Sequence, residues 1–116
     1  MSLRDTLTGA VSGLLLERPF RNKDFAEIAQ ELDLAGGRLK HTFAAANDNP
    51  GNRRLLSHIV GMERWGQSRL RVALGEPLTL DEYDDYRPPR ESTWSALQDA
   101  FSETRQLTVA VVRQLG

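Results

Sequence analysis

The sequence predicts an all-α protein, a helix bundle of roughly four helices in an up-and-down arrangement, within a single domain over residues 1–116. Two observations support this fold class. Apolar residues recur at steps of three and four in several long segments, as on one face of a helix. Clusters of Gly, Pro, Asn and Asp separate these segments. In addition, no segment alternates apolar and polar residues as a half-buried strand does.

Two helical segments are expected in the first part of the chain. Asn22 is expected to cap the second of them. Gly36 and Gly37 are expected to break or end that helix, because glycine lowers helix stability, and a helical face restarts at Leu39. The first helix is expected over residues 3–16. Its apolar face consists of Leu3, Leu7, Ala10, Val11, Leu14 and Leu15.

Turn-forming residues at 47–52 precede a third expected helix over residues 52–74. Gly75 and then Pro77 end this helix. Residues 76–89 follow as a loop rich in acidic residues and tyrosine. The buried stripe of the third helix is expected to consist of Leu55, Ile59, Met62, Gly66, Leu70 and Ala73.

The fourth helix is expected to begin at a cap formed by Ser92 or Thr93 and to reach the C-terminus. Its apolar residues step alternately by three and four, which is typical of near-antiparallel packing in a bundle. The same seam would also suit packing across a homodimer. The seam consists of Trp94, Leu97, Phe101, Thr104, Thr108, Val111 and Leu115.

The composition excludes several classes of partner and site. With 15 basic and 16 acidic residues, the chain has a formal net charge of −1, so no global charge attracts it to nucleic acid or to anionic lipid. The absence of cysteine removes disulfides and thiolate sites and fits the cytoplasmic location that we expect. No apolar run approaches the roughly 18 residues of a membrane span, so no membrane association is expected.

The most informative segment is residues 57–65, which places His58, Glu63 and Trp65 in a mostly apolar helix. Such polar groups are costly inside a bundle unless they are paired, liganded or partly wet. One interpretation makes His58 a metal ligand or a general base. The alternative is structural: His58 bonds to a carbonyl or a water, and Glu63 pairs with an arginine from another helix.

Residues 55–65 resemble the second-helix segment of the DinB-like (YfiT-like) superfamily of four-helix-bundle proteins. That segment typically has an early histidine, followed five residues later by glutamate and then by an aromatic residue, as His58, Glu63 and Trp65 are arranged here. A loop and a capped helix follow at matching positions. The resemblance covers about residues 47–116 and implies a DinB-like bundle.

The resemblance also implies nickel or zinc, held by three histidines in many members, and a low-molecular-weight thiol cofactor in some. His58 matches the first metal-binding histidine. The other two belong to a His-x-x-x-His pair on a last family helix that has no counterpart in this chain, whose only other histidine is His41. Because a catalytic zinc site needs three protein ligands, an incomplete or metal-free site is expected.

We therefore expect a DinB-like bundle protein that binds a small ligand or a partner, with an incomplete metal site at His58. A metal- or thiol-cofactor-dependent hydrolase or transferase activity is implied by the resemblance alone. The acidic loop is interpreted as a solvated loop, and the alternative interpretation is a lid over one end of the bundle. The residues expected to line the ligand pocket are Glu63, Trp65, Tyr83 and Tyr86.

The alternative hypothesis is a DNA-binding regulator with a helix-turn-helix unit at residues 24–43. A recognition helix starting near Gly36 would direct Arg38, Lys40 and His41 toward phosphates or base edges. Acidic residues between 27 and 33 offset these cations, and the whole chain is slightly acidic. Nucleic acid is therefore the less favoured partner.

Overall fold

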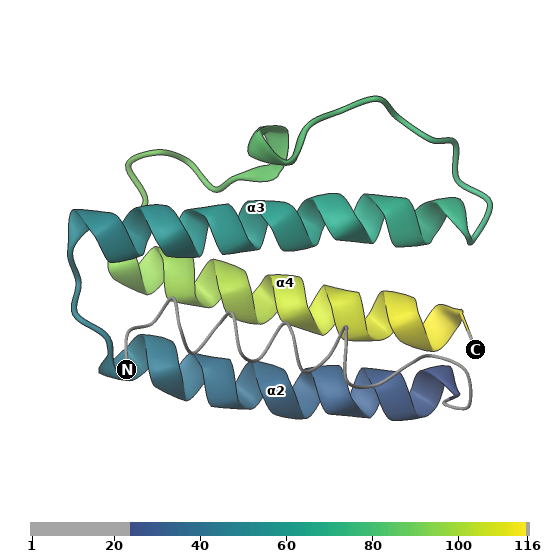
Figure 1. Cartoon of the computed structure of the whole chain (residues 1–116), viewed down its shortest axis with the longest axis horizontal. Coiled ribbons are helices and arrows are strands. Elements are labelled where there is room, and N and C mark those ends of the chain that lie inside the picture. The colour runs from purple at the N-terminus through teal and green to yellow at the C-terminus, as the bar shows by residue number, and fades with distance from the viewer. Residues whose placement is uncertain (1–23, 116) are drawn as a thin grey trace.

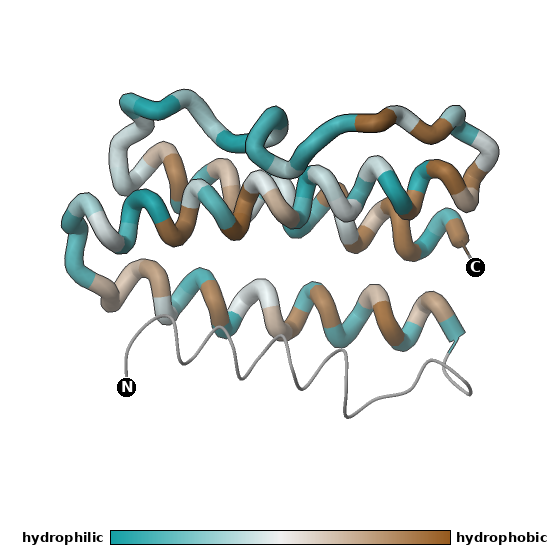
Figure 2. Tube along the Cα trace, turned by 45° about the horizontal axis from the view of Figure 1, so that its top comes forward, coloured by the Kyte–Doolittle hydropathy of each residue, from teal (hydrophilic) through white to brown (hydrophobic). Residues whose placement is uncertain are grey.

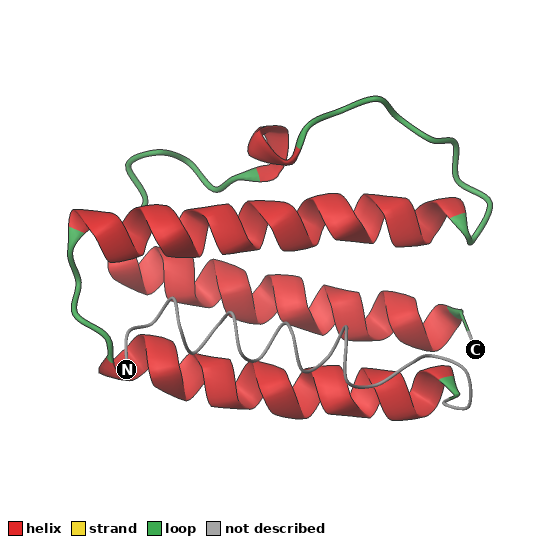
Figure 3. Ribbon diagram, viewed as in Figure 1, coloured by secondary structure: helices red, strands yellow, loops and turns green. Residues whose placement is uncertain are grey.

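The computed structural model describes residues 24–115, which form three long α-helices and one short 3₁₀-helix. The α-helices are α2 (Phe25–Ala45), α3 (Pro50–Val72) and α4 (Trp94–Gln114), and the 3₁₀-helix is η2 (Tyr83–Tyr86). They lie side by side, as Figure 1 shows. The described residues contain no strand, as the colouring of Figure 3 makes plain. The all-α prediction is confirmed, and the expected helix at residues 3–16 lies outside the described residues.

Helix α2 begins two residues later than expected and is continuous. Its N-cap is Asp24, not Asn22, and the Asp24 carboxylate accepts a hydrogen bond from the Glu27 amide at 2.8 Å. The predicted break at Gly36 and Gly37 is wrong, since the helix passes through both. Each glycine costs only about 1 kcal/mol in a helix, and tertiary packing of the buried face outweighs this cost.

The two glycines of α2 differ in their surroundings. A Cβ on Gly36 would lie 2.7 Å from Arg105 Cγ of α4, whereas a Cβ on Gly37 would meet nothing within 4 Å. Gly36 is therefore the residue that lets the Arg105 side chain cross the α2 backbone. Its role is close packing between helices rather than helix termination.

This difference predicts opposite effects for two adjacent substitutions. Gly37→Ala should raise the free energy of unfolding by roughly 0.5–1 kcal/mol, the usual gain in helix propensity. Gly36→Ala should lower it by about 1–2 kcal/mol, because the new methyl group displaces a side chain that is held in place. Urea denaturation of both variants tests this pair. Equal stabilisation by both alanines would contradict the close packing of Arg105 on α2.

Helix α3 starts at Pro50, two residues before the predicted start. The Asn49 side chain caps it by accepting from the Asn52 amide at 2.8 Å. At the other end, Gly75 has φ of +101°, the left-handed conformation that glycine favours. The expected termination by glycine is thus confirmed.

The predicted buried stripe of α3 is rotated from the observed one. The fully buried side chains are Leu56, Val60 and Gln67, together with Gly61, whereas Met62 is 46% exposed. Leu55 and Ile59 lie only at the edge of the core. The prediction failed because α3 is covered on two sides, by α4 and by the crossover that carries η2, so hydrophobicity alone does not mark its core face.

Helix α4 begins after Thr93, whose hydroxyl accepts from the Ala96 amide at 3.1 Å. The predicted seam is confirmed from Trp94 to Val111, with each of its residues buried, and Leu115 is partly buried. The seam faces α2 and α3 of the same chain, where Phe101 packs edge-to-face on Phe43 at 4.9 Å.

The predicted up-and-down order is wrong for the described helices, because α3 and α4 run parallel. Leu56 and Val60 near the start of α3 pack with Trp94 and Phe101 of α4, and Leu70 near its end packs with Val109 and Val112. Figure 1 shows the same direction for both helices, with α2 opposed to them. Residues 73–93 form the long crossover that this order requires.

The apolar core is divided into two clusters by a buried polar layer. One cluster contains Phe43, Leu56 and Phe101, and the other contains Ala29, Val109 and Val112. Figure 2 shows hydrophobic positions recurring along each helix among hydrophilic ones. The polar layer between the clusters consists of Glu63, Gln67, Thr104, Arg105 and Thr108. None of the described helices is long and apolar enough to cross a lipid bilayer.

Candidate functional site

The buried polar layer is centred on an ion pair between α3 and α4. Arg105 Nη2 donates to Glu63 Oε1 at 2.8 Å, and these side chains are 12% and 16% exposed. Arg105 Nη1 also donates to the Leu32 carbonyl of α2 at 3.0 Å. The Thr108 hydroxyl donates to Glu63 Oε2 at 3.0 Å. One arginine therefore joins all three helices, and the structural alternative for Glu63 is confirmed.

The remaining members of the layer complete its hydrogen bonds. Gln67 Nε2 lies 2.7 Å from the Thr104 carbonyl and 2.9 Å from the Thr108 hydroxyl, donating to both. Arg64 donates to the Thr104 hydroxyl at 3.1 Å. Every buried polar side-chain atom of residues 24–115 has a partner. A fully satisfied layer of this kind positions helices relative to one another and leaves no group for a ligand.

The crossover is attached along the outer side of α3. Residues 76–90 are called the strap below. The Trp65 indole donates to the Asp81 carbonyl at 3.2 Å. Arg69 forms an ion pair with the Asp81 carboxylate at 3.2 Å. The Arg69 guanidinium also lies 4.5 Å from the centre of the Trp65 ring. The Tyr86 hydroxyl donates to the same carboxylate. Arg64 reaches the Tyr86 carbonyl at 3.2 Å.

Asp81 is the ionised centre of this attachment. The hydroxyl of Tyr86 lowers the pKa of Asp81 below its usual value, with further contributions from Thr79 and Arg69. A carboxyl group whose pKa is depressed in the docked state stabilises that state above its ordinary pKa, and the contribution is lost as the pH falls through the lowered value. The strap is therefore held by a charge that persists at neutral pH.

His58 lies beside the strap rather than in a group of metal donors. Its ring packs edge-to-face on Tyr83 with the centroids 5.2 Å apart. No group of three His, Cys, Asp or Glu residues suited to a metal ion occurs within residues 24–115. A nickel or zinc site of the three-ligand kind does not fit the donors that these residues provide around His58.

The four residues expected to line a ligand pocket lie in separate places. Glu63 is in the buried polar layer, Trp65 and Tyr86 both contact Asp81, and Tyr83 packs on His58. The two cavities described below are lined by other residues. The acidic loop, for which a lid over one end of the bundle was the alternative interpretation, lies along the side of α3, as seen in Figure 1.

The predicted helix-turn-helix unit is wrong. Residues 25–43 belong to the single helix α2, so the turn that would orient a recognition helix does not exist. Arg38 is exposed on α2. Lys40 and His41 instead line a cavity of about 630 Å³ between α2 and α4, opposite Asp99 and Glu103. The negative charges of Asp99 and Glu103 offset the positive charge that binding to a nucleic-acid phosphate backbone would require.

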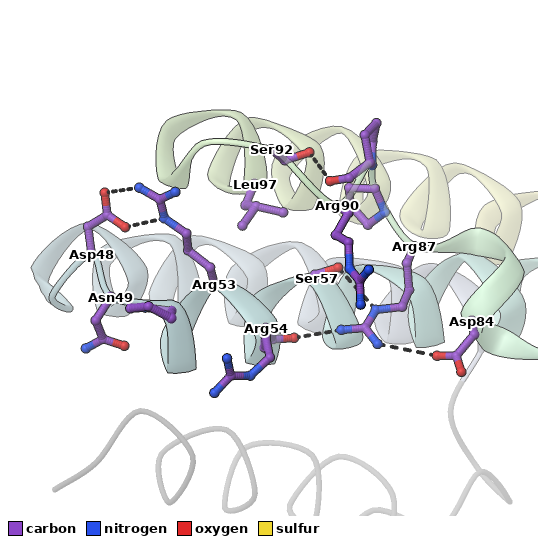
Figure 4. A pocket seen from close by; sticks show the side chains of 13 residues that line it. Asp48, Asn49, Arg53, Arg54, Ser57, Asp84, Arg87, Arg90, Ser92 and Leu97 are labelled. Atoms are coloured by element: carbon purple, nitrogen blue, oxygen red, sulfur yellow. Dashed lines mark hydrogen bonds and ion pairs between the residues drawn. The ribbon is translucent and has the colours of Figure 1, made fainter.

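The larger cavity is a cleft of about 810 Å³ between the start of α3 and the end of the strap. It is called the arginine cleft below, after Arg53, Arg54, Arg87 and Arg90, which line it. In Figure 4, Arg53 lies beside Asp48 at one end of the cleft, and Arg87 and Arg90 lie at the other. The Leu97 side chain of α4 contributes an apolar part of the lining.

Two of the four arginines are held by structural contacts. Arg53 forms a two-point ion pair with Asp48, at 2.5 and 2.7 Å, which lowers the pKa of the Asp48 carboxyl. Arg87 donates to the Ser57 hydroxyl at 3.2 Å, to the Arg54 carbonyl at 3.1 Å and to Asp84 at 3.5 Å. These contacts fasten the strap to α3 at the cleft.

The other two arginines carry uncompensated charge. Among the described residues, neither Arg54 nor Arg90 has an ion pair. Since the cleft is lined by four arginines and only two carboxylates, from Asp48 and Asp84, it has an excess of two positive charges. Clefts lined by one sign of charge concentrate ligands of the opposite sign.

Sequence reasoning did not find this site. Arg53 and Arg54 belong to no recognisable binding motif, and Arg87 and Arg90 lie on a loop more than 30 residues further along the chain. The signal in the sequence was weak: an arginine pair in the first turn of a helix, and two arginines around Pro88-Pro89. Comparison with protein-family models, curated proteins and solved structures finds no match to this chain.

Proposed function

We propose that this chain is a DinB-like helical-bundle protein that binds a small anionic ligand in the arginine cleft. The single observation that carries the proposal is a pair of guanidinium groups, Arg54 and Arg90, that have no ion pair within residues 24–115 and line a cleft with excess positive charge. A guanidinium presents a planar fork of donors that matches carboxylate and phosphate oxygens. The cleft therefore offers charge and hydrogen-bond geometry that the fold itself does not use.

The size and construction of the cleft support the same proposal. Its volume of about 810 Å³ falls in the range of small-molecule sites, roughly 300–1,000 Å³. The cleft is built from two segments that are locked together by Arg87, which contacts Ser57 and the Arg54 carbonyl. Because the two backbone segments are already held together, binding does not have to order them first, and this lowers the cost of binding.

The finer details of the fold belong to the same proposal. We propose that residues 3–16 supply the fourth helix of the bundle. The support is that apolar residues recur in this segment at steps of three and four, as on one face of a helix. Together with residues 24–115, this segment would complete the DinB-like arrangement that residues 55–65 resemble.

The test is titration of the protein with inorganic phosphate, followed by the backbone amide NMR shifts of the non-proline residues within 48–57 and 84–92. Arg90→Gln should weaken phosphate binding by roughly tenfold, the loss expected when a charge-assisted hydrogen bond of about 1.4 kcal/mol is removed. Arg113→Gln, a charge-matched change at an exposed position of α4 outside the cleft, should leave it unchanged. Equal weakening by both variants would show general charge attraction and contradict a defined site.

A further inference from the structure

We infer that the ligand of the arginine cleft is a dianion attached to an apolar group, of the class of organic phosphomonoesters. This inference rests on the proposed anion-binding function and specifies its ligand. It follows from two properties of the cleft that anion binding alone does not require: the size of its charge excess and the character of its uncharged lining.

The charge excess matches a dianion better than a monoanion. The arginines outnumber the carboxylates of the lining by two, and Asp48 and Asp84 are already engaged by Arg53 and Arg87. A phosphomonoester carries about −1.5 to −2 charges at pH 7. Its charge therefore matches the excess of two positive charges over the whole lining, whereas a monoanion leaves one of these charges uncompensated.

The uncharged lining matches an organic body on the ligand. Pro50, Pro88, Pro89 and Leu97 all line the cleft. Proline rings present apolar surface without a backbone donor of their own, and Pro88 is buried against the body of the protein. The cleft volume exceeds what an inorganic phosphate ion fills, since small-ligand sites of several hundred Å³ enclose whole organic molecules.

The phosphate end and the apolar end can be placed in the cleft. Figure 4 shows Leu97 lying between the Arg53 end and the Arg90 end. Ser57 lines the cleft on the side of α3, where its hydroxyl already accepts from Arg87 and keeps a proton to donate. We place the phosphate between Arg90 and Ser57, and the organic group against Leu97 and the proline rings.

The test compares phenyl phosphate with phenyl sulfate by isothermal titration calorimetry on the full chain at pH 7.5. The two probes have nearly the same shape, but the sulfate ester carries one negative charge. Phenyl phosphate should bind about five- to tenfold more tightly, as expected for one additional charge near an arginine at the protein surface. Arg90→Gln should remove most of this difference, and Arg113→Gln should preserve it. Inorganic phosphate should bind several-fold more weakly than phenyl phosphate.

The outcomes separate this inference from the proposed function. If phenyl sulfate binds as tightly as phenyl phosphate, the dianion inference is overturned and the anion-binding function stands. If inorganic phosphate binds as tightly as phenyl phosphate, the apolar part of the inference is overturned. If none of the three probes binds, both the inference and the proposed function are wrong.

Discussion

Replacement of Arg105 by methionine is expected to lower the free energy of unfolding by about 3 kcal/mol or more, the usual loss when one partner of a buried ion pair is removed. Glu63 would remain at 16% exposure with its charge uncompensated. The Leu32 carbonyl of α2 would also lose the hydrogen bond that it accepts from Arg105. Urea denaturation followed by far-ultraviolet circular dichroism at pH 7 measures the loss.

A second variant separates the ion pair from simple packing. In Glu63→Met/Arg105→Met both charges are absent, and such apolar replacements of buried pairs are often neutral or stabilising. We expect the double variant to recover most of the stability lost in Arg105→Met. If the double variant is as unstable as Arg105→Met, the loss comes from the shape of Arg105 against Gly36 rather than from the uncompensated carboxylate.

Substitution of Gly61 by alanine is expected to detach the strap. A Cβ on Gly61 would lie 2.7 Å from Arg87 Cγ and 3.1 Å from the Tyr83 carbonyl oxygen. Because one of these neighbours is backbone, the strap must move. We expect a net loss of about 1–3 kcal/mol, the usual cost of overpacking, and faster amide exchange over residues 83–87. Hydrogen exchange measured by mass spectrometry reports this change directly.

Gly66 provides the matched control on the same helix. A Cβ on Gly66 would meet nothing within 4 Å, so Gly66→Ala should raise stability by up to about 1 kcal/mol through helix propensity and leave the strap protected. Gly61→Ala should also weaken phosphate binding, since Arg87 and Arg90 both lie on the strap. Retention of wild-type exchange over residues 83–87 in Gly61→Ala would contradict the close contact of the strap with α3.

The helices were more predictable than their arrangement. The buried seam of α4 follows from the spacing of its apolar residues, and the end of α3 follows from the conformational preference of Gly75. Both predictions are confirmed. The break at Gly36 was wrong because the reason for that glycine, the crossing Arg105 side chain, lies 69 positions away in the sequence. The stripe of α3 was misplaced because the strap covers a second side of that helix, and periodicity within one segment carries no information on such a partner.

The candidate site could not be predicted because its residues come from separate segments that only the course of the chain brings together. Its arginines come from residues 53–54 and 87–90, which meet only because the crossover returns to the start of α3. Of the residues expected to be functional, Glu63 pairs with Arg105, and the His58 ring packs on the ring of Tyr83. In each case the decisive neighbour belongs to another element, and its identity depends on the direction in which the helices run.

The parallel course of α3 and α4 has an electrical consequence. Each helix has a dipole with its positive end at the N-terminus, and these two dipoles point the same way, whereas α2 opposes them. Among the three described α-helices, one dipole is therefore left without an opposing neighbour. Its positive end lies at the arginine cleft, which Asn49 and Pro50 line at the start of α3 and Ser92 lines just before α4. At this end of the described helices, the two positive N-termini outnumber the one negative C-terminus, so the helix dipoles add to the positive potential that the arginines create.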